Sequence, residues 1–449
     1  MKLKITFLVL FLGTAMVLKA TDVRGKPNII IILADDLGYH DVGYMGGKDF
    51  LTPNIDAIAN NGVWFTNGYT TCPVCAPTRA GLLTGRYQNR FGFEDNPGPY
   101  RQSKEIIPGI PLREKTMGEY FKEMGYSTAI IGKWHTENVE SQNPVHRGFD
   151  KFFGFIGGAS GYFIGENRKG KILRGTRPVL SEDDYLTDAF GREATLFIER
   201  NSNRNNPFLL YVPFNAPHGP FQAPEKYISM FSHIKDKKRR VLAAMIYSLD
   251  ENVGLITSKI KELGLEENTL IIFISDNGGV LNLSDNSPLR SGKQDIYEGG
   301  IRVPFCMQWK EHLPENKKID FPVISLDILP TAIAATGNQV DREWRLDGVN
   351  LLPYLTGAKE GIPHEVLYWR FLWHYAIRKG DWKLLKHRDH TDVELYNLAV
   401  DVGEQHDLCK EHPEIVEELQ QLFNDWSDMM LKPQWGWQPE YCGDYKVGK

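Results

Sequence analysis

The sequence contains no low-complexity tract, no clear internal repeat and little net charge for its length. The 449 residues carry a formal charge of −5, which gives no indication of a nucleic-acid partner. One basic run, 235–240, precedes apolar residues at helical spacing and is interpreted as the solvated start of a helix. Past residue 20, no apolar run approaches the roughly 20 residues of a membrane-spanning helix. These absences favour a globular protein without a stable membrane anchor.

Residues 1–20 have the pattern of an export signal. Lys2 and Lys4 form a short basic region, Ile5–Leu18 is almost entirely apolar, and Ala20 offers a small residue for cleavage. A membrane anchor is the alternative, but the apolar stretch is shorter than a spanning helix needs. We therefore predict cleavage near Ala20 and an exported protein, either periplasmic or secreted.

The five cysteines do not determine a disulfide pattern. Cys409 and Cys442 could bridge the C-terminal region of an exported protein. Cys306 lies in an apolar run and is predicted to be a packed thiol. Cys75 could be a buried residue at a helix start, bridged to Cys72, or it could have a chemical role.

Short apolar runs without polar alternation predict strands that are buried on both faces of a largely parallel sheet. The clearest are Asn28–Ala34 and Leu270–Ser275, both rich in isoleucine. Further strands and helices are predicted at Ser127–Ile131, Phe208–Val212, Lys115–Met124 and Arg239–Leu263. Alternating strands and helices are typical of a doubly wound α/β domain. We predict such a domain over residues 26–360, because the length suits one large domain and a smaller one.

The pattern changes after about residue 360. Tyr375–Leu385 is predicted to form two short strands around a Gly-Asp turn, and Glu394–Leu398 a further short element. Glu411–Met430 has the spacing of an amphipathic helix. We predict a smaller α+β subdomain over residues 361–449 that carries an antiparallel sheet.

Each of the two clearest strands is followed by a polar pair. Asp35 and Asp36 follow the first strand, and Asp276 and Asn277 follow the second. Ligands collect at the carboxyl ends of strands in such sheets, and three carboxylates there would repel one another without a cation. Oxygen donors without thiol or imidazole suit Ca²⁺, or Mg²⁺ as the alternative, rather than zinc. The other interpretation is that each pair only caps a helix or forms a turn.

The segment Cys75–Arg86 carries the most informative motif, Cys-Ala-Pro-Thr-Arg-Ala-Gly-Leu-Leu-Thr-Gly-Arg. It closely resembles the signature of type I sulfatases, C-x-P-x-R followed by Leu-Thr-Gly-Arg. In that family a maturation enzyme oxidises the cysteine to formylglycine, and the hydrated aldehyde attacks sulfur. Thr78 stands where serine is most common, which is a mild departure.

Three further segments resemble motifs of the same family, and the resemblance covers about residues 26–400. They are Gly132–His135 (Gly-Lys-Trp-His), Asn215–His218 (Asn-Ala-Pro-His) and Ser291–Pro304, which contains Gly-Lys and Glu-Gly-Gly-Ile-Arg-Val-Pro. After His135 the usual Leu-Gly is replaced by Thr-Glu, so the adjacent loop is expected to differ.

The resemblance implies an alkaline-phosphatase-like fold and one Ca²⁺ ion in the active site. The family's motifs place the ion among the residues that match Asp35, Asp36, Cys75 (as formylglycine), Asp276 and Asn277. Magnesium is the less favoured ion. On this basis the same strand-end residues that suggest a hard cation are expected to bind it.

The resemblance also implies catalytic roles. Arg79 and Lys133 would hold the hydrated aldehyde. His218, with Lys293, would bind the sulfate and protonate the departing alcohol, and His135 would take the second proton. Fixed cations in a dry pocket stabilise the negative charge that grows as the S–O bond breaks.

The implied activity is hydrolysis of sulfate esters. Residues 146–158 resemble carbohydrate sulfatases more than aryl or steroid ones, so the expected substrate is a sulfated polysaccharide or its oligosaccharides. Arg370 and His374, in an aromatic stretch, are predicted to bind the sugar, with packing of the C-terminal sheet as the alternative. The rival functions are a phosphonate or phosphate ester hydrolase of the same superfamily and an inactive glycan-binding homologue. The first usually needs more cationic neutralisation or a second metal, and the second would be expected to lose a catalytic residue.

Overall fold

The computed structural model describes residues 25–136, 139–163, 172–179, 185–202, 206–442 and 445–446. The predicted export signal, and Glu137 beside the Gly-Lys-Trp-His segment, lie outside the described residues. None of the helices in the described part of the chain is long and apolar enough to cross a membrane.

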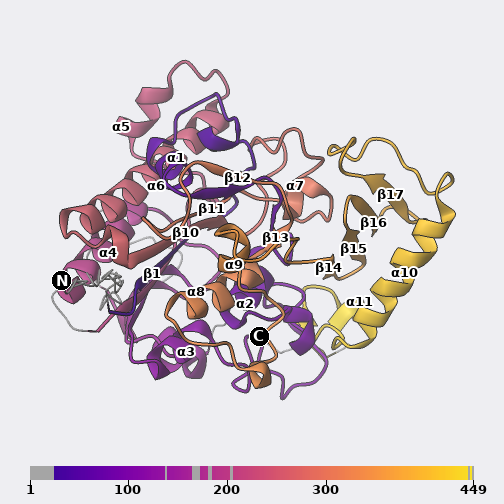
Figure 1. The fold of residues 1–449 in the computed structure, drawn as a ribbon, viewed down its shortest axis with the longest axis horizontal. Coiled ribbons are helices and arrows are strands. Elements are labelled where there is room, and N and C mark those ends of the chain that lie inside the picture. Colours follow the sequence, from indigo (N-terminus) through magenta and orange to yellow (C-terminus); the bar gives the residue numbers. More distant parts are fainter. Residues whose placement is uncertain are drawn as a thin grey trace, which may run out of the picture.

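A ten-stranded sheet, in the order β12-β2-β11-β10-β1-β9-β5-β6-β7-β8, forms the centre of the molecule (Figure 1). Its strands are β1 (Asn28–Ala34), β2 (Val63–Phe65), β5 (Ser127–Lys133), β6 (Lys151–Phe155), β7 (Leu173–Arg174), β8 (Arg177–Pro178), β9 (Phe208–Pro213), β10 (Thr269–Ser275), β11 (Phe305–Gln308) and β12 (Lys317–Ile319). The five strands from β10 to β6 run parallel, whereas β11, β7 and β8 pair antiparallel with their neighbours. This topology confirms the predicted mostly parallel α/β domain.

Helices cover both faces of this sheet, which explains the continuous apolar run in β1. Ile30 and Ile32 share one core cluster with α1, α4 and α6. Ile29, Ile31 and Leu33 share the other with α2, α3 and α8 (Figure 1). The six helices are α1 (Pro53–Asn60), α2 (Cys75–Thr84), α3 (Met117–Glu123), α4 (Leu186–Ser202), α6 (Lys237–Glu262) and α8 (Ile328–Ala335).

A four-stranded antiparallel sheet packs against α10 (Pro413–Asp428) at one end of the molecule (Figure 1). Its strands, in order, are β14 (Val366–Phe371), β15 (His374–Lys379), β16 (Trp382–Lys386) and β17 (Glu394–Asn397). The predicted strands around the Gly-Asp turn are confirmed as β15 and β16, and the predicted helix as α10. The sequence prediction omits β14, because its aromatic density suits a binding edge as well as a strand. Alternate residues of β14 are buried, as expected for a sheet packed on one face.

Smaller elements complete the described fold. Two short sheets pair β3 (Gly68–Tyr69) with β13 (Val323–Ile324), and β4 (Tyr100–Arg101) with β18 (Trp435–Gly436) and β19 (Tyr445–Lys446). Short helices are α5 (Glu225–Ile228), α7 (Glu298–Ile301), α9 (Leu352–Leu355) and α11 (Pro439–Cys442).

The structure corrects the disulfides considered from the sequence. Cys72, Cys75, Cys306 and Cys409 are free thiols. Cys409 Sγ donates to the Val393 carbonyl at 3.2 Å instead of bridging to Cys442, whose side chain lies outside the described set. Cys306 is buried in β11, so the prediction of a packed thiol is confirmed.

Candidate active site

The two polar pairs after β1 and β10 meet at one edge of the central sheet. Because these strands are adjacent and parallel, with Ala34 in register with Ser275, both end at the same level. The backbone N–H of Asp36 donates to Asp276 Oδ1 at 3.2 Å, and Asn277 Nδ2 donates to Asp36 Oδ1 at 2.8 Å. Asp36 has a φ of 67°, a left-handed conformation that Asp adopts more readily than most residues. The topology therefore gathers the residues that the sequence singled out.

Helix α2 begins at Cys75 and brings Arg79 into the same site. Residues four apart lie on one face of a helix, so Arg79 lies one turn beyond Cys75. The buried guanidinium donates to Asp276 Oδ2 at 2.7 and 3.0 Å, and to the carbonyl of Lys133 at 2.9 Å. Its Nη2 also lies 3.5 Å from Asp35 Oδ2. Arg79 thus ties the start of α2 to the ends of three strands.

Two lysines pair with the first acidic pair. Lys133, the last residue of β5, is buried and places Nζ 2.6 Å from Asp35 Oδ2. Lys293 lies in the loop between β10 and α7 and reaches Asp36 Oδ2 at 2.6 Å. Burial lowers the pKa of Lys293, but the negative groups around it, Asp36 foremost, together outweigh burial and hold it above its usual range. This ammonium therefore stays charged at neutral pH.

Two histidines lie beside these cations. His218 places Nε2 3.8 Å from Asp36 Oδ2, and its Nδ1 contacts the Gly219 carbonyl at 2.5 Å. Burial, and then the charge of Lys133, lowers the pKa of His218 to about 4. The same two causes hold the pKa of His135 well below its usual value. Both imidazoles are neutral at pH 7, and the buried His135 Nδ1 has no hydrogen-bond partner among the described residues.

The pKa values of Asp36 and Asp276 are shifted in opposite directions because their neighbours differ. Burial raises the pKa of Asp36, but Lys293 and His218 outweigh burial and lower it to about 2. For Asp276, burial and then repulsion from Asp35 raise the pKa to about 6. A divalent cation at this edge would relieve that repulsion.

Unpartnered oxygen atoms in the same place fit a hard cation. Asp35 Oδ1 and Asn277 Oδ1 are buried without a hydrogen-bond partner in the described part of the chain. Such atoms are costly unless a ligand satisfies them. Ligand atoms of Asp35, Cys75 and Asp276 lie within 4.8 Å of one another. With an oxygen in place of the Cys75 sulfur, the donor set is all oxygen, which suits Ca²⁺.

The sequence analysis misses Asn96, whose side chain contacts the first residues of α2 from another segment. Its Oδ1 accepts the backbone N–H of Ala76 at 3.2 Å and lies 3.9 Å from Cys75 Sγ. Asn96 belongs to an irregular segment with no periodic pattern, so a single sequence offers no signal for this contact.

The predicted sugar-binding residues lie on β14 and β15. The Arg370 guanidinium donates to Glu94 Oε1 at 2.8 Å and to Ser427 Oγ at 2.7 Å. His374 is 1% exposed and stacks on Phe371 with ring centroids 5.8 Å apart. The burial of His374 favours the alternative of core packing, and sugar binding by Arg370 stays a prediction.

Comparisons with known proteins cover most of the chain. The family model described as Sulfatase matches residues 27–338, and one described as N-sulphoglucosamine sulphohydrolase, C-terminal, matches residues 291–428. The chain is 28% identical to the uncharacterized sulfatase YdeN of Escherichia coli K12, over 91% of this chain and 87% of that protein. It is 30% identical to mouse N-acetylgalactosamine-6-sulfatase, over 82% of this chain and 74% of that protein.

A solved structure is similar over nearly the whole fold. The crystal structure of Ps i-CgsB in complex with k-i-k-neocarrahexaose has a TM-score of 0.86 and 35% identity, and covers 92% of this chain and 96% of that chain. The likeness therefore extends over most of both chains.

Proposed function

The chain belongs to the sulfatase family and is a sulfuric ester hydrolase, and we propose that it desulfates a sulfated polysaccharide or its oligosaccharides with formylglycine at position 75 and one Ca²⁺ ion. The observation that carries this proposal is the convergence of Cys75 with three cations, two of them fully buried, and a set of unpartnered oxygens. We further propose residues 1–20 as an export signal, 26–360 as the catalytic domain and 361–449 as the C-terminal subdomain. A maturation enzyme would modify Cys75 during biogenesis.

The cations of the site are arranged to hold a sulfate ester. Asp35, Asp36, Asp276 and Asn277 would hold Ca²⁺, which supplies charge neutralisation and acidifies a bound hydroxyl. Formylglycine at position 75 would supply the attacking hydroxyl. The three acidic charges of the site are balanced by three basic ones, so an added divalent ion leaves the pocket positive and attractive to a sulfate anion.

Proton transfer falls to the two histidines. His218 Nδ1 is held by the Gly219 carbonyl, which leaves Nε2 to face the substrate. A bound sulfate places negative charge beside His218 and raises the pKa of its imidazole, so Nε2 can carry a proton to the departing oxygen. Lys293 keeps its charge and binds the sulfate. The neutral, unpartnered Nδ1 of His135 suits the acceptor of the proton released when sulfate leaves.

Three observations support a sugar substrate. One relative is named N-acetylgalactosamine-6-sulfatase, and one similar structure holds a neocarrahexaose. Trp373, between β14 and β15, is 41% exposed. The adjoining Phe371 and Leu372 pack against Cys72 and Val74, so this exposed indole belongs to a loop that contacts the segment just before Cys75. Sugar rings stack on such aromatic faces.

The decisive experiment joins sulfate release to the chemical state of residue 75. Wild-type protein should release sulfate from a defined sulfated oligosaccharide, and mass spectrometry of the peptide carrying residue 75 should show formylglycine. Cys75→Ala should abolish release, whereas Cys72→Ser, a change at the neighbouring buried thiol, should retain the modification. Unmodified cysteine throughout a fully active preparation would refute the nucleophile.

A further inference from the structure

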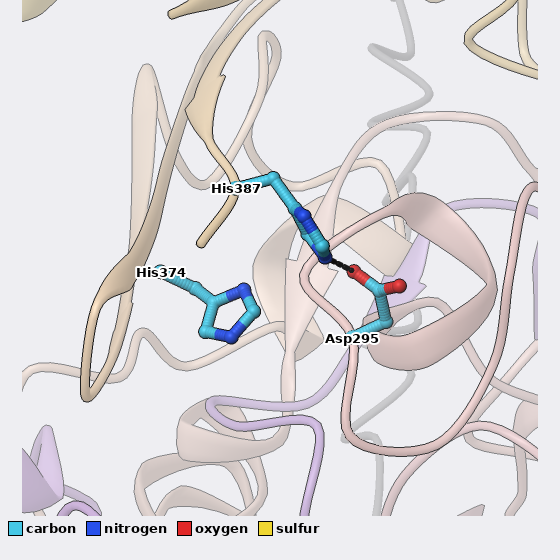
Figure 2. Close-up of side chains that lie close together, drawn as sticks. All are labelled: Asp295, His374 and His387. Atoms are coloured by element: carbon cyan, nitrogen blue, oxygen red, sulfur yellow. Dashed lines mark ion pairs between the residues drawn. The ribbon is translucent and has the colours of Figure 1, made fainter. Parts of the chain in front are cut away.

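Outside the oxygen-rich site, the structure brings together two imidazoles and a carboxylate from distant parts of the chain. Asp295 lies in the loop that carries Lys293, His374 begins β15, and His387 follows β16. One ligand atom from each of Asp295, His374 and His387 lies within 4.8 Å of the other two. Figure 2 shows His387 and Asp295 facing each other, with a ring nitrogen of His374 turned toward the same gap.

The distance between His387 Nε2 and Asp295 Oδ1 suits two ligands of one metal ion. His387 Nε2 lies 3.4 Å from Asp295 Oδ1, which is longer than a well-formed N–H···O hydrogen bond. Two ligands on one tetrahedral ion, with bonds of about 2.0–2.2 Å, lie about 3.3–3.5 Å apart. The existing geometry therefore admits an ion between these atoms without a large movement of either side chain.

His374 supplies a second, independent observation. The residue is 1% exposed, and its Nδ1 is buried without a hydrogen-bond partner in the described ranges. Burial, and then the charge of His387, lowers the pKa of His374 to about 4, so the ring is neutral and has a lone pair to offer. An unpaired buried nitrogen costs free energy, and an ion would remove that cost.

The surrounding groups hold the ligands in place. Asp295 Oδ2 accepts from Ser291 Oγ at 2.7 Å, and its Oδ1 accepts the backbone N–H of Ile296 at 2.7 Å. His387 Nδ1 accepts the backbone N–H of Asp389 at 3.2 Å and lies 3.5 Å from the Asp389 Oδ2. When Nε2 binds a metal, the imidazole proton resides on Nδ1, and the Asp389 carboxylate can accept it in exchange for the N–H contact. A carboxylate behind a ligating histidine is a common support of metal sites.

From this arrangement we propose that Asp295, His374 and His387 form a second metal site, which binds a borderline divalent transition metal such as Zn²⁺. Two imidazoles and one carboxylate match zinc rather than calcium, and water would complete the coordination. The site joins the C-terminal sheet to the loop that carries Lys293. Zinc bound there would therefore restrain an active-site loop without contacting the substrate.

The test is zinc binding to the chelator-treated full-length protein, measured by calorimetry with calcium in excess so that the oxygen site is filled. Wild-type protein should bind one Zn²⁺ per chain. His374→Ala and His387→Gln should each weaken binding at least about tenfold, because even the loss of a supporting group costs about 10–100-fold. The matched control is His406→Ala, at a histidine whose side chain is 83% exposed, and it should bind zinc like wild type.

Cobalt provides a readout that a structural effect alone would not change. Co²⁺ in the same site should show the visible absorption of a four-coordinate ion, and His374→Ala should lose that absorption. Asp295→Asn, at a partly exposed residue, serves if a histidine variant does not fold. The proposal is overturned if wild type binds no zinc, or if every variant binds zinc as wild type does, which would point to the Cys75 site instead.

Discussion

Two clusters of charged side chains in this molecule have similar compositions. They differ in whether the carboxylate and amide oxygens have hydrogen-bond or ion-pair partners. The active-site cluster contains Asp35, Asp36, Asp276, Arg79, Lys133 and Lys293. The second, which we call the inter-sheet cluster, contains Tyr69, Glu298, Arg302, Lys383 and Glu404. It lies where the C-terminal sheet meets α7.

The inter-sheet cluster uses both oxygens of its central carboxylate. Glu298 accepts from Lys383 Nζ at 2.9 Å and from the Tyr69 hydroxyl at 2.6 Å. Lys383 Nζ also lies 2.8 Å from Glu404 Oε1, so this buried oxygen is paired with an ammonium although it accepts no hydrogen bond among the described residues. In the active-site cluster, by contrast, Asp35 Oδ1 and Asn277 Oδ1 have no protein partner among the described residues. Paired charge therefore holds the C-terminal sheet against α7 and β3. The active-site cluster, which we call the open cluster, keeps unpaired oxygens that leave room for an ion and a substrate.

The largest effect is expected from Asp36→Asn, which tests the open cluster. Asn tolerates the left-handed backbone of this position but removes one charge from the cation site. We expect kcat/KM for sulfate release to fall on the order of 10³-fold, since a catalytic ion supplies several kcal/mol of transition-state stabilisation. Calcium titrations should show weaker activation. Glu298→Gln, in the inter-sheet cluster, should lower stability and leave calcium affinity unchanged. Full wild-type activity after exhaustive chelation would contradict the assignment.

The next effect distinguishes proton transfer from sulfate binding within the open cluster. His218→Ala should slow a sugar sulfate roughly 10²–10⁴-fold, the usual range for general acid catalysis. It should slow an activated aryl sulfate less, because that oxygen leaves without a proton. Steady-state kinetics on both substrates measures the difference, with the exposed His233→Ala as control. Equal losses on both substrates would mean that His218 only binds sulfate.

The sequence indicated the acidic residues of the open cluster because each pair follows a strand that can be recognised on its own. Asp35 and Asp276 each end an isoleucine-rich run, and adjacent parallel strands must bring such ends together. Position 75 and Arg79 are one helical turn apart, so their spacing is also local. Local sequence thus indicated the acidic residues, and the resemblance to sulfatase motifs supplied the roles of Arg79, Lys133 and Lys293.

The contacts that the sequence could not predict depend on how separate segments pack. Asn96 reaches α2 from an irregular segment, and the Asp295–His374–His387 group joins the loop after β10 to the start of β15 and the residue after β16. The burial of His374 depends in turn on β14, which the sequence prediction omitted. Such contacts have no periodicity along the chain, so only the folded structure reveals them.

An effect on stability rather than on activity is expected from breaking the inter-sheet cluster. Lys383→Met leaves two buried carboxylates without their shared cation and should lower the free energy of unfolding by about 3–5 kcal/mol. Denaturant unfolding measures this change. Lys293→Met, in the open cluster, should cost less stability because that side chain is 15% exposed, yet it should impair sulfate release more. If Lys293→Met proves more destabilising than Lys383→Met, the distinction between the inter-sheet cluster and the open cluster fails.

The smallest effect comes from a buried pair whose charge can be switched by pH. His364 Nε2 lies 2.8 and 2.9 Å from the Asp327 oxygens. Burial lowers the pKa of His364, but Asp327 outweighs burial and raises it above the usual 6.5. Because the folded state then binds the proton more tightly, this stabilisation is complete below the unfolded pKa and is lost as pH rises through the folded value. His364→Ala should therefore cost about 1.5–3 kcal/mol at pH 5.5, the usual contribution of a hydrogen bond to a charged group, and less at pH 9. Urea unfolding of wild type and variant at both pH values measures the difference, and His406→Ala should show none. An equal cost at the two pH values would show that His364 stabilises the fold only as a neutral hydrogen-bond donor.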